Sequence, residues 1–121
     1  MITPKSVAVW VVQILLALLF ALQGIIKLTS APVWVARFKA WGYPDHFYLA
    51  VGLGELVGAI LLFIPRLARF GALILMTVMI GAAATHVLHR ERQVITTVIL
   101  MALLAIVLYV RRQTAIAPVG T

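Results

Sequence analysis

Long apolar stretches alternate with short polar segments along the chain. The apolar stretches cover residues 7–27, 47–64, 70–88 and 93–110. Each is close to the length of about 20 residues that an α-helix needs to cross the hydrocarbon core of a bilayer. The connections at 65–69 and 90–92 are so short that the helices they join must be antiparallel neighbours. The pattern predicts an all-α integral membrane protein, a single domain over residues 1–121 with a four-helix up-down-up-down bundle.

The first apolar stretch has the position of a secretory signal. It is longer than the roughly 7–15 residues of a signal's apolar core, and no A-x-A cleavage site follows it. We therefore expect it to be retained as the first membrane helix.

An aromatic segment separates the first and second apolar stretches. Ser30 can cap a short helix that has Pro32 in its first turn. Trp34, Phe38 and Trp41 recur at helical spacing, and the basic residues of the segment fall away from that stripe. This predicts a short amphipathic helix in the membrane interface. It would serve as an anchor, since Trp and Tyr favour that depth, or as a lid over a pocket, and the two roles are compatible.

Composition supports lipid as the solvent of this chain. Hydrophobic residues make up 64% of it and the mean hydropathy is +1.15, whereas soluble proteins have roughly 45–50% apolar residues. The net charge of +7 comes mostly from residues at helix ends, where they would meet anionic headgroups. No basic helix face with interleaved aromatic residues is present, so nucleic-acid binding is not expected. The lack of cysteine excludes disulfides, CxxC redox centres and iron–sulfur clusters.

Basic residues are divided almost evenly between the two sides of the predicted bundle. The side of the chain termini has Lys5, Arg66, Arg69, Arg111 and Arg112. The opposite side has Lys27, Arg37, Lys39, Arg90 and Arg92. If Lys27 lies within the bundle, the balance is five to four, and the positive-inside rule then places both termini in the cytoplasm.

Glu55 is an acid near the middle of the second apolar stretch. A carboxylate is expensive in lipid and by default marks a functional site. Its helical neighbours Gly52, Gly58 and Ala59 are small, and Gly54 forms a GxxxG pair with Gly58. Small residues let helices approach closely, so we expect Glu55 to face the interior of the bundle.

The predicted topology gathers most polar side chains of the apolar stretches into one half of the bundle. They are Gln23, Lys27, Glu55, Thr85, His86, His89, Gln93, Thr96 and Thr97. Lys27 or a protonated His86 within about 4–6 Å would keep Glu55 charged. A carboxylate beside an imidazole can move protons or polarise a carbonyl group. Glu55, His86 and Lys27 are therefore the candidate catalytic residues. The candidate ligand-binding residues are Gln23, Thr85, His89, Thr96, Trp34, Trp41 and Tyr43.

Each of these residues also has a structural interpretation. Lys27 can extend to the headgroups or form a purely structural ion pair with Glu55. Thr96 and Thr97 can hydrogen-bond their own helix backbone, His86 can make a purely structural hydrogen bond, and His89 can lie in the interface. A metal held by His86, His89 and Glu55 is conceivable, but only one acid is nearby, so no metal site is predicted.

Several short motifs resemble the DoxX and DoxX-like family across residues 7–112. They are Gly24-x-x-Lys27, Trp41-Gly42-Tyr43-Pro44, Gly52-x-Gly54-Glu55-Leu56-x-Gly58-Ala59, Ile64-Pro65-Arg66, Gly71-Ala72 and Gly81-Ala82-Ala83-Ala84-Thr85-His86. The resemblance implies a small four-helix protein of the bacterial inner membrane. Some relatives are implied to be subunits of quinone-reducing thiosulfate oxidation systems, and others associate with membrane oxidoreductase complexes. Vitamin K epoxide reductases share the architecture, but their paired cysteines are absent here, so thiol redox chemistry does not carry over.

The first hypothesis for function is a membrane protein that binds a quinone-like or other lipophilic molecule in the polar half of the bundle. It would act as a redox subunit or as a small enzyme, with a membrane oxidoreductase complex or a second copy of the chain as partner. The alternative is a non-catalytic assembly subunit. A proton-coupled exporter resembling the small multidrug-resistance transporters is less favoured, since their membrane carboxylate lies in the first helix and this one lies in the second.

Overall fold

The computed structural model describes residues 4–111, with side chains from Val7 onward. Its helices are α1 (Pro4–Leu28), α2 (Pro32–Ala40), α3 (Phe47–Phe63), α4 (Ala68–Leu88) and α5 (Gln93–Arg111). Each predicted apolar stretch coincides with one long helix, and the aromatic segment contains α2, so the all-α prediction is confirmed. Arg112 and the side chain of Lys5, both used in the charge count, lie outside the described residues.

Three of the long helices have the length and composition needed to cross a membrane. They are α1, over Val7–Leu28, together with α4 and α5. The apolar helix α3 has 17 residues, which corresponds to roughly 25 Å at about 1.5 Å per residue. This is somewhat less than the hydrocarbon thickness of about 30 Å.

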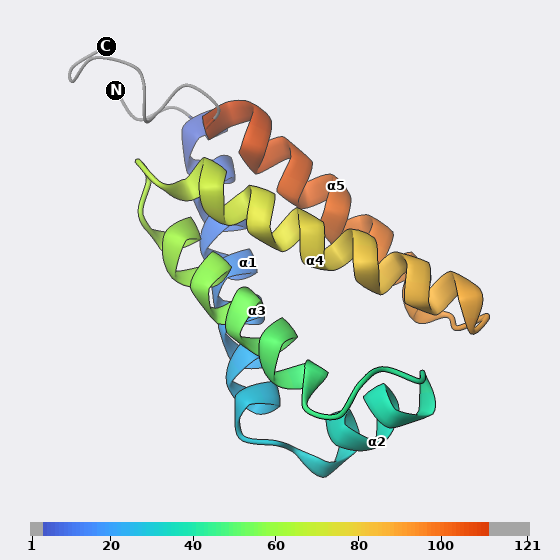
Figure 1. The fold of residues 1–121 in the computed structure, drawn as a ribbon. Coiled ribbons are helices and arrows are strands. Elements are labelled where there is room, and N and C mark those ends of the chain that lie inside the picture. Colours follow the sequence, from blue (N-terminus) through green and yellow to red (C-terminus); the bar gives the residue numbers. More distant parts are fainter. Residues whose placement is uncertain (1–3, 112–121) are drawn as a thin grey trace.

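The long helices form two antiparallel pairs, α1 with α3 and α4 with α5 (Figure 1). The pairs meet where α3 turns into α4, and α1 also contacts α5 there. From that end the pairs diverge, and α2 lies at the open end, packed against α3. A cavity lies between the two pairs, and α2 contributes to its lining.

The hydrophobic core lies where the two pairs meet. Its buried members include Leu16, Ala17, Phe20, Ala59, Leu62, Ala72, Leu75, Leu104 and Val107. The outer faces of the same helices expose Leu15, Leu18, Leu22, Leu53, Ile60, Ile80, Ile99 and Ile106. Large apolar side chains are thus found on the outside of the helices as well as in the core, which is typical of helices that contact lipid.

Glycines set the distance between α3 and its two neighbours. A Cβ atom on Gly24 would lie 2.7 Å from the carbonyl oxygen of Gly52, between α1 and α3. A Cβ atom on Gly71 would lie 2.6 Å from the carbonyl oxygen of Gly58, between α4 and α3. The close approach therefore uses Gly52 and Gly58, as expected from sequence. A Cβ atom on Gly54 would have only one neighbour, a side chain at 3.7 Å.

The start of α2 differs from the prediction. Its N-cap residue is Ala31, which makes no side-chain capping bond, so the expected cap by Ser30 is wrong. Ser30 has a left-handed backbone, with φ of 57°, and its hydroxyl accepts a hydrogen bond of 3.0 Å from Tyr48 on α3. With this left-handed backbone, the Ser30 hydroxyl is directed toward α3 instead of the start of α2. Within α2, Phe38 is buried and Arg37 is exposed.

Candidate functional site

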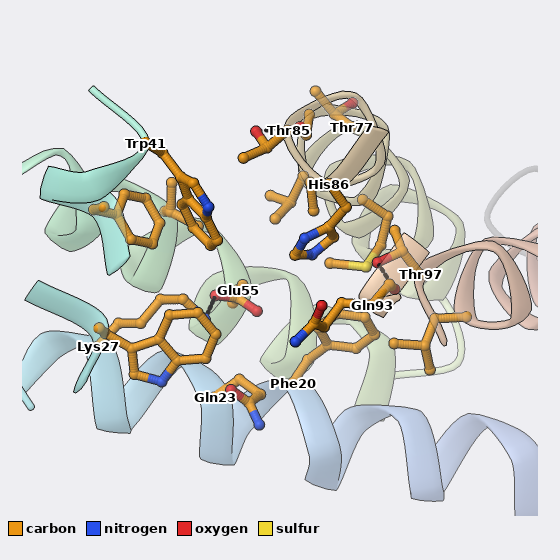
Figure 2. A pocket seen from close by; sticks show the side chains of 18 of the residues that line it. Phe20, Gln23, Lys27, Trp41, Glu55, Thr77, Thr85, His86, Gln93 and Thr97 are labelled. Carbon is orange, nitrogen blue, oxygen red and sulfur yellow. Dashed lines mark hydrogen bonds and ion pairs between the residues drawn. The ribbon is translucent and has the colours of Figure 1, made fainter. Parts of the chain in front are cut away.

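A cavity of about 610 Å³ lies between the two helix pairs, with α2 and the segment after it on one side (Figure 2). All the helices contribute to its walls. Its polar lining residues are Gln23, Lys27, Glu55, Thr77, Thr85, His86, Gln93, Thr96 and Thr97. The volume falls within the range of about 300–1,000 Å³ found for small-molecule sites.

Lys27 and Glu55 form a buried ion pair on one wall of the cavity. The distance from Lys27 Nζ to Glu55 Oε1 is 2.7 Å, and the two residues are only 4% and 3% exposed. The Lys27 ammonium also lies 3.9 Å from the centre of the Trp34 ring, a cation–π contact. Lys27 therefore points into the protein and does not extend to the headgroups. The close approach of Gly24 to Gly52 brings the two charges together, because it presses α1 against α3.

His86 lines the cavity from α4 and is paired with Glu91, in the turn between α4 and α5. The distance from His86 Nδ1 to Glu91 Oε1 is 2.8 Å. The other carboxylate oxygen of Glu91 accepts a hydrogen bond of 3.3 Å from the Trp41 indole. The hydrogen bond from His86 first, and that from Trp41 second, lower the pKa of Glu91 below its ordinary value. Figure 2 shows the imidazole of His86 directed from α4 into the cavity.

The segment after α2 makes a second contact with α4 through Tyr43. The Tyr43 hydroxyl is hydrogen-bonded to the Thr85 hydroxyl, which also donates to the carbonyl oxygen of Gly81 at 2.9 Å. Because Thr85 has a single hydrogen to donate, Tyr43 is the donor to Thr85. Trp41 and Tyr43 thus tie the α2 segment to α4 and to the turn that follows α4.

Aromatic rings close the side of the cavity next to α2. Phe38 lies at their centre, with ring-centroid distances of 5.3 to 6.3 Å to its neighbours. Those neighbours are Trp34, Trp41, Tyr43, Phe47 and Tyr48. The predicted ligand-binding aromatic residues Trp34, Trp41 and Tyr43 all line the cavity.

The other polar residues predicted from the sequence differ in whether they line the cavity. Gln23 and Thr96 line the cavity, whereas His89 is exposed after the end of α4 and does not line it. The Thr97 hydroxyl donates a hydrogen bond of 2.9 Å to the backbone carbonyl of Gln93, so its donor is used within its own helix.

Glu91 is the main residue of this region that sequence reasoning passed over. An acid between Arg90 and Arg92 in a tight turn resembles an ordinary solvated residue. Arg90 has a left-handed backbone, with φ of 55°, and the turn folds Glu91 back onto the end of α4. The sequence does contain one signal for Glu91, the scarcity of acidic residues. The whole chain has three acids, and one of them follows His86 by five positions.

A separate polar link lies at the end where the helix pairs meet. The Gln13 side chain is fully buried and donates to the carbonyl oxygen of Leu62 at 2.7 Å. Its amide oxygen accepts a hydrogen bond of 3.0 Å from Arg111, whose guanidinium lies 4.9 Å from the centre of the Trp10 ring. This link joins α1, α3 and α5 at the opposite end from the ion pair.

The described residues contain no group of three or more histidine or acidic side chains placed to hold a metal ion. Glu55 is paired with Lys27 and His86 with Glu91, while His89 lies outside the cavity. These three residues therefore do not come together as metal ligands.

Residues 11–109 match the sequence model of the DoxX-like family. No curated protein and no solved structure matches the chain. The matched range includes every residue that lines the cavity. The chain therefore belongs to the DoxX-like family and is a membrane protein with long apolar helices.

Proposed function

We propose that this protein binds a lipophilic small molecule with a neutral polar head in the cavity, with a quinone as the leading candidate. The observation that carries the proposal is the cavity of about 610 Å³ with a buried ion pair on its wall. An ion pair between two helices needs no cavity beside it for stability. Its position on the wall of a cavity offers hydrogen bonds to a bound head group.

The lining supports a lipophilic ligand. Large parts of the wall are apolar, from Leu19, Phe20, Val51, Val78, Met79 and Leu100. The outer faces of the helices are apolar as well, so a ligand dissolved in the bilayer can reach the protein without leaving lipid. A ligand with an alkyl or isoprenoid tail and a compact polar head fits both properties.

Charge in the cavity favours a neutral head over a cationic one. Lys27 already occupies the place beside Glu55 and over Trp34 that an organic cation would take. A cation entering the cavity would have to displace that ammonium or lie beside it. This weighs against an exporter of cationic drugs, whose membrane carboxylate must be free for its substrate.

On this proposal Lys27 donates a hydrogen bond to a carbonyl or hydroxyl oxygen of the head. Glu55 holds the Lys27 ammonium in place and is directed into the cavity (Figure 2). His86, Thr85 and Gln23 would contact other atoms of the head. A partner membrane oxidoreductase complex would supply electrons if the bound quinone is reduced.

We further propose that α3 crosses the bilayer as a fourth span, giving the up-down-up-down topology, and that α2 lies in the interface as a lid. Lys27 is buried in its ion pair, so the basic residues number five on the side of the termini and four on the other. This balance favours cytoplasmic termini in the bacterial inner membrane.

The test is a binding titration of the purified protein in lipid nanodiscs with a long-chain alkyl benzoquinone. Trp34 and Trp41 line the cavity, so bound quinone should quench their fluorescence with a saturable curve. Gly81 also lines the cavity, and a Cβ there would meet no atom within 4 Å. Gly81→Leu therefore fills space without straining the backbone, and it should weaken binding by about tenfold or more.

Ala84→Leu is the matched control, since Ala84 is exposed on the same helix and does not line the cavity. It should leave binding unchanged. Absence of saturable quenching, or equal affinity in the two variants, would overturn the proposal. If Glu55→Gln then impairs assembly of a complex, the assembly-subunit alternative would be favoured.

A further inference from the structure

The two oxygens of Glu91 are both engaged, and this fixes how its carboxylate lies. One accepts from His86 Nδ1 at 2.8 Å and the other from the Trp41 indole at 3.3 Å. The ring of Trp41 also meets that of His86 edge-on, with centroids 5.7 Å apart and an interplanar angle of 83°. The imidazole is thus held by a hydrogen bond in its plane and by an aromatic contact.

The pairing determines which nitrogen of a neutral imidazole carries the hydrogen. An ionised carboxylate has only acceptor atoms, so the hydrogen between His86 and Glu91 belongs to Nδ1. A neutral imidazole has one N–H group, so Nε2 of His86 is left as an acceptor. Glu91 does not line the cavity, whereas His86 does. The cavity therefore presents an acceptor on the α4 wall and a donor, the Lys27 ammonium, on the α1–α3 wall.

We infer that Glu91 is a positioning residue that makes the cavity select a head group with a hydroxyl, such as a hydroquinone, over the corresponding quinone. This inference rests on the proposed function and narrows its ligand class. A hydroxyl donates to Nε2 of His86 and still offers its oxygen as an acceptor elsewhere. A quinone has only acceptor oxygens, so it leaves Nε2 without a partner, and an unmatched polar group in a buried site weakens binding.

The decisive variant is Glu91→Gln, which retains the shape and reverses the polarity. The glutamine amide oxygen can accept from Trp41, and its NH₂ group then donates to His86 Nδ1. No other arrangement satisfies both partners, since an amide NH₂ cannot accept from the indole. Nδ1 becomes the acceptor, and the hydrogen of the imidazole moves to Nε2. The cavity then presents donors on both walls and should prefer the quinone.

The experiment measures the affinities of three probes in nanodiscs at pH 8. The probes are a long-chain alkyl hydroquinone under anaerobic reducing conditions, its quinone, and its dimethyl ether. The unchanged protein should bind the hydroquinone roughly 3- to 10-fold more tightly than the quinone and the ether. Glu91→Gln should bind the quinone more tightly than the hydroquinone. Arg92→Gln, in the same turn, is the matched control and should keep the original preference.

A second measurement does not depend on any ligand. The ¹⁵N signals of the His86 imidazole should show a protonated Nδ1 and a bare Nε2 in the unchanged protein, and the reverse in Glu91→Gln. His46 and His89, outside the cavity, can be replaced by glutamine to assign those signals.

The outcomes separate the inference from the proposed function. If no probe binds, both are overturned. If the probes bind without preference, or with the same preference in Glu91→Gln as in the unchanged protein, the inference fails and the proposed function stands. A bare Nδ1 in the unchanged protein would also overturn the inference.

Discussion

The Lys27 ammonium and the Glu55 carboxylate lie 2.7 Å apart with their side chains 6% and 4% exposed. Each charge has lost most of its hydration, and the other charge provides the compensation. Trp34 adds a cation–π contact to the ammonium. At the scale of single residues, the stability of this wall of the cavity therefore depends on the pair and not on either residue alone.

Removal of one partner should accordingly be worse than removal of both. We expect Lys27→Met to destabilise the protein by about 3 kcal/mol or more, because Glu55 would stay buried without its partner. The double variant Lys27→Met/Glu55→Gln should recover a large part of that loss. Thermal unfolding in detergent is the measurement, with Lys39→Met, at an exposed position, as the control. Additive losses in the double variant would show that the two groups are not coupled.

Glu91 gives a prediction for acid pH. Its lowered pKa means that the folded protein favours the carboxylate form, through the hydrogen bonds from His86 and Trp41. The resulting stabilisation is fully present above the pKa of glutamate in an unfolded chain, about 4.3, and is lost as the pH falls through the lower folded-state value. The tie between Trp41 and the α4–α5 turn should therefore loosen only below about pH 4.3.

Fluorescence of Trp41 during an acid titration, with Trp10 and Trp34 replaced by Phe, would report this loosening. His86 and His89 are the other titratable groups that act on Glu91. The transition should be absent from Glu91→Gln. A transition of the same size in that variant would assign it to another group.

At the scale of helices, α3 is the element on which the site depends. It contacts α1 through Gly52 and α4 through Gly58, and it places Glu55 between these contacts. A short helix with a close neighbour on each side positions its side chains with little freedom. The α2 segment has less support, since it packs on α3 and is tied to α4 by side chains after its end.

Two glycines on α4 should respond oppositely to the same substitution. A Cβ on Gly71 would lie 2.6 Å from one backbone atom of α3 and 2.7 Å from another, so Gly71→Ala must push the helices apart. We expect a loss of about 1–3 kcal/mol. A Cβ on Gly81 would meet nothing within 4 Å, and Gly81→Ala should gain up to about 1 kcal/mol from helix propensity. Unfolding temperatures of the two variants would check this contrast, and equal shifts would contradict it.

At the scale of the whole molecule, the two ends of the helix pairs differ in what fills them. Where the pairs meet, small and aliphatic residues pack closely and Gln13 links Arg111 to the carbonyl of Leu62. Where they diverge, aromatic side chains and α2 bound the cavity. One end therefore holds the fold together, and the other end leaves room for a ligand.

The absence of cysteine allows a direct test of the proposed topology. Single cysteines at Arg66 and at Arg90 lie in turns at the two ends of α4, which is long enough to cross a membrane. With a membrane-impermeant maleimide on intact cells, we expect labelling at position 90 and protection at position 66. Labelling only at 66 would reverse the orientation, and labelling at both would contradict a single orientation of the chain across the membrane.

Particular residues show how much of the fold and of the candidate site could be predicted from the sequence. The five helices and the inward face of Glu55 followed from local periodicity and from the small residues around it, because both properties depend on neighbours three or four positions away. The gathering of polar residues in one half followed from the short connections, which force the chain to reverse. The positions of Ser30 and His89 did not follow, since each depends on a loop conformation.

Residue order by itself therefore determined the helices, their membrane character and the half of the molecule that holds the polar groups. Only the tertiary structure decided the partners: Glu55 with Lys27, and His86 with Glu91. The physical reason is that partner choice depends on helix rotation and on separations of a few ångströms. Those are set by the glycine contacts of α3 and by the left-handed turn at Arg90.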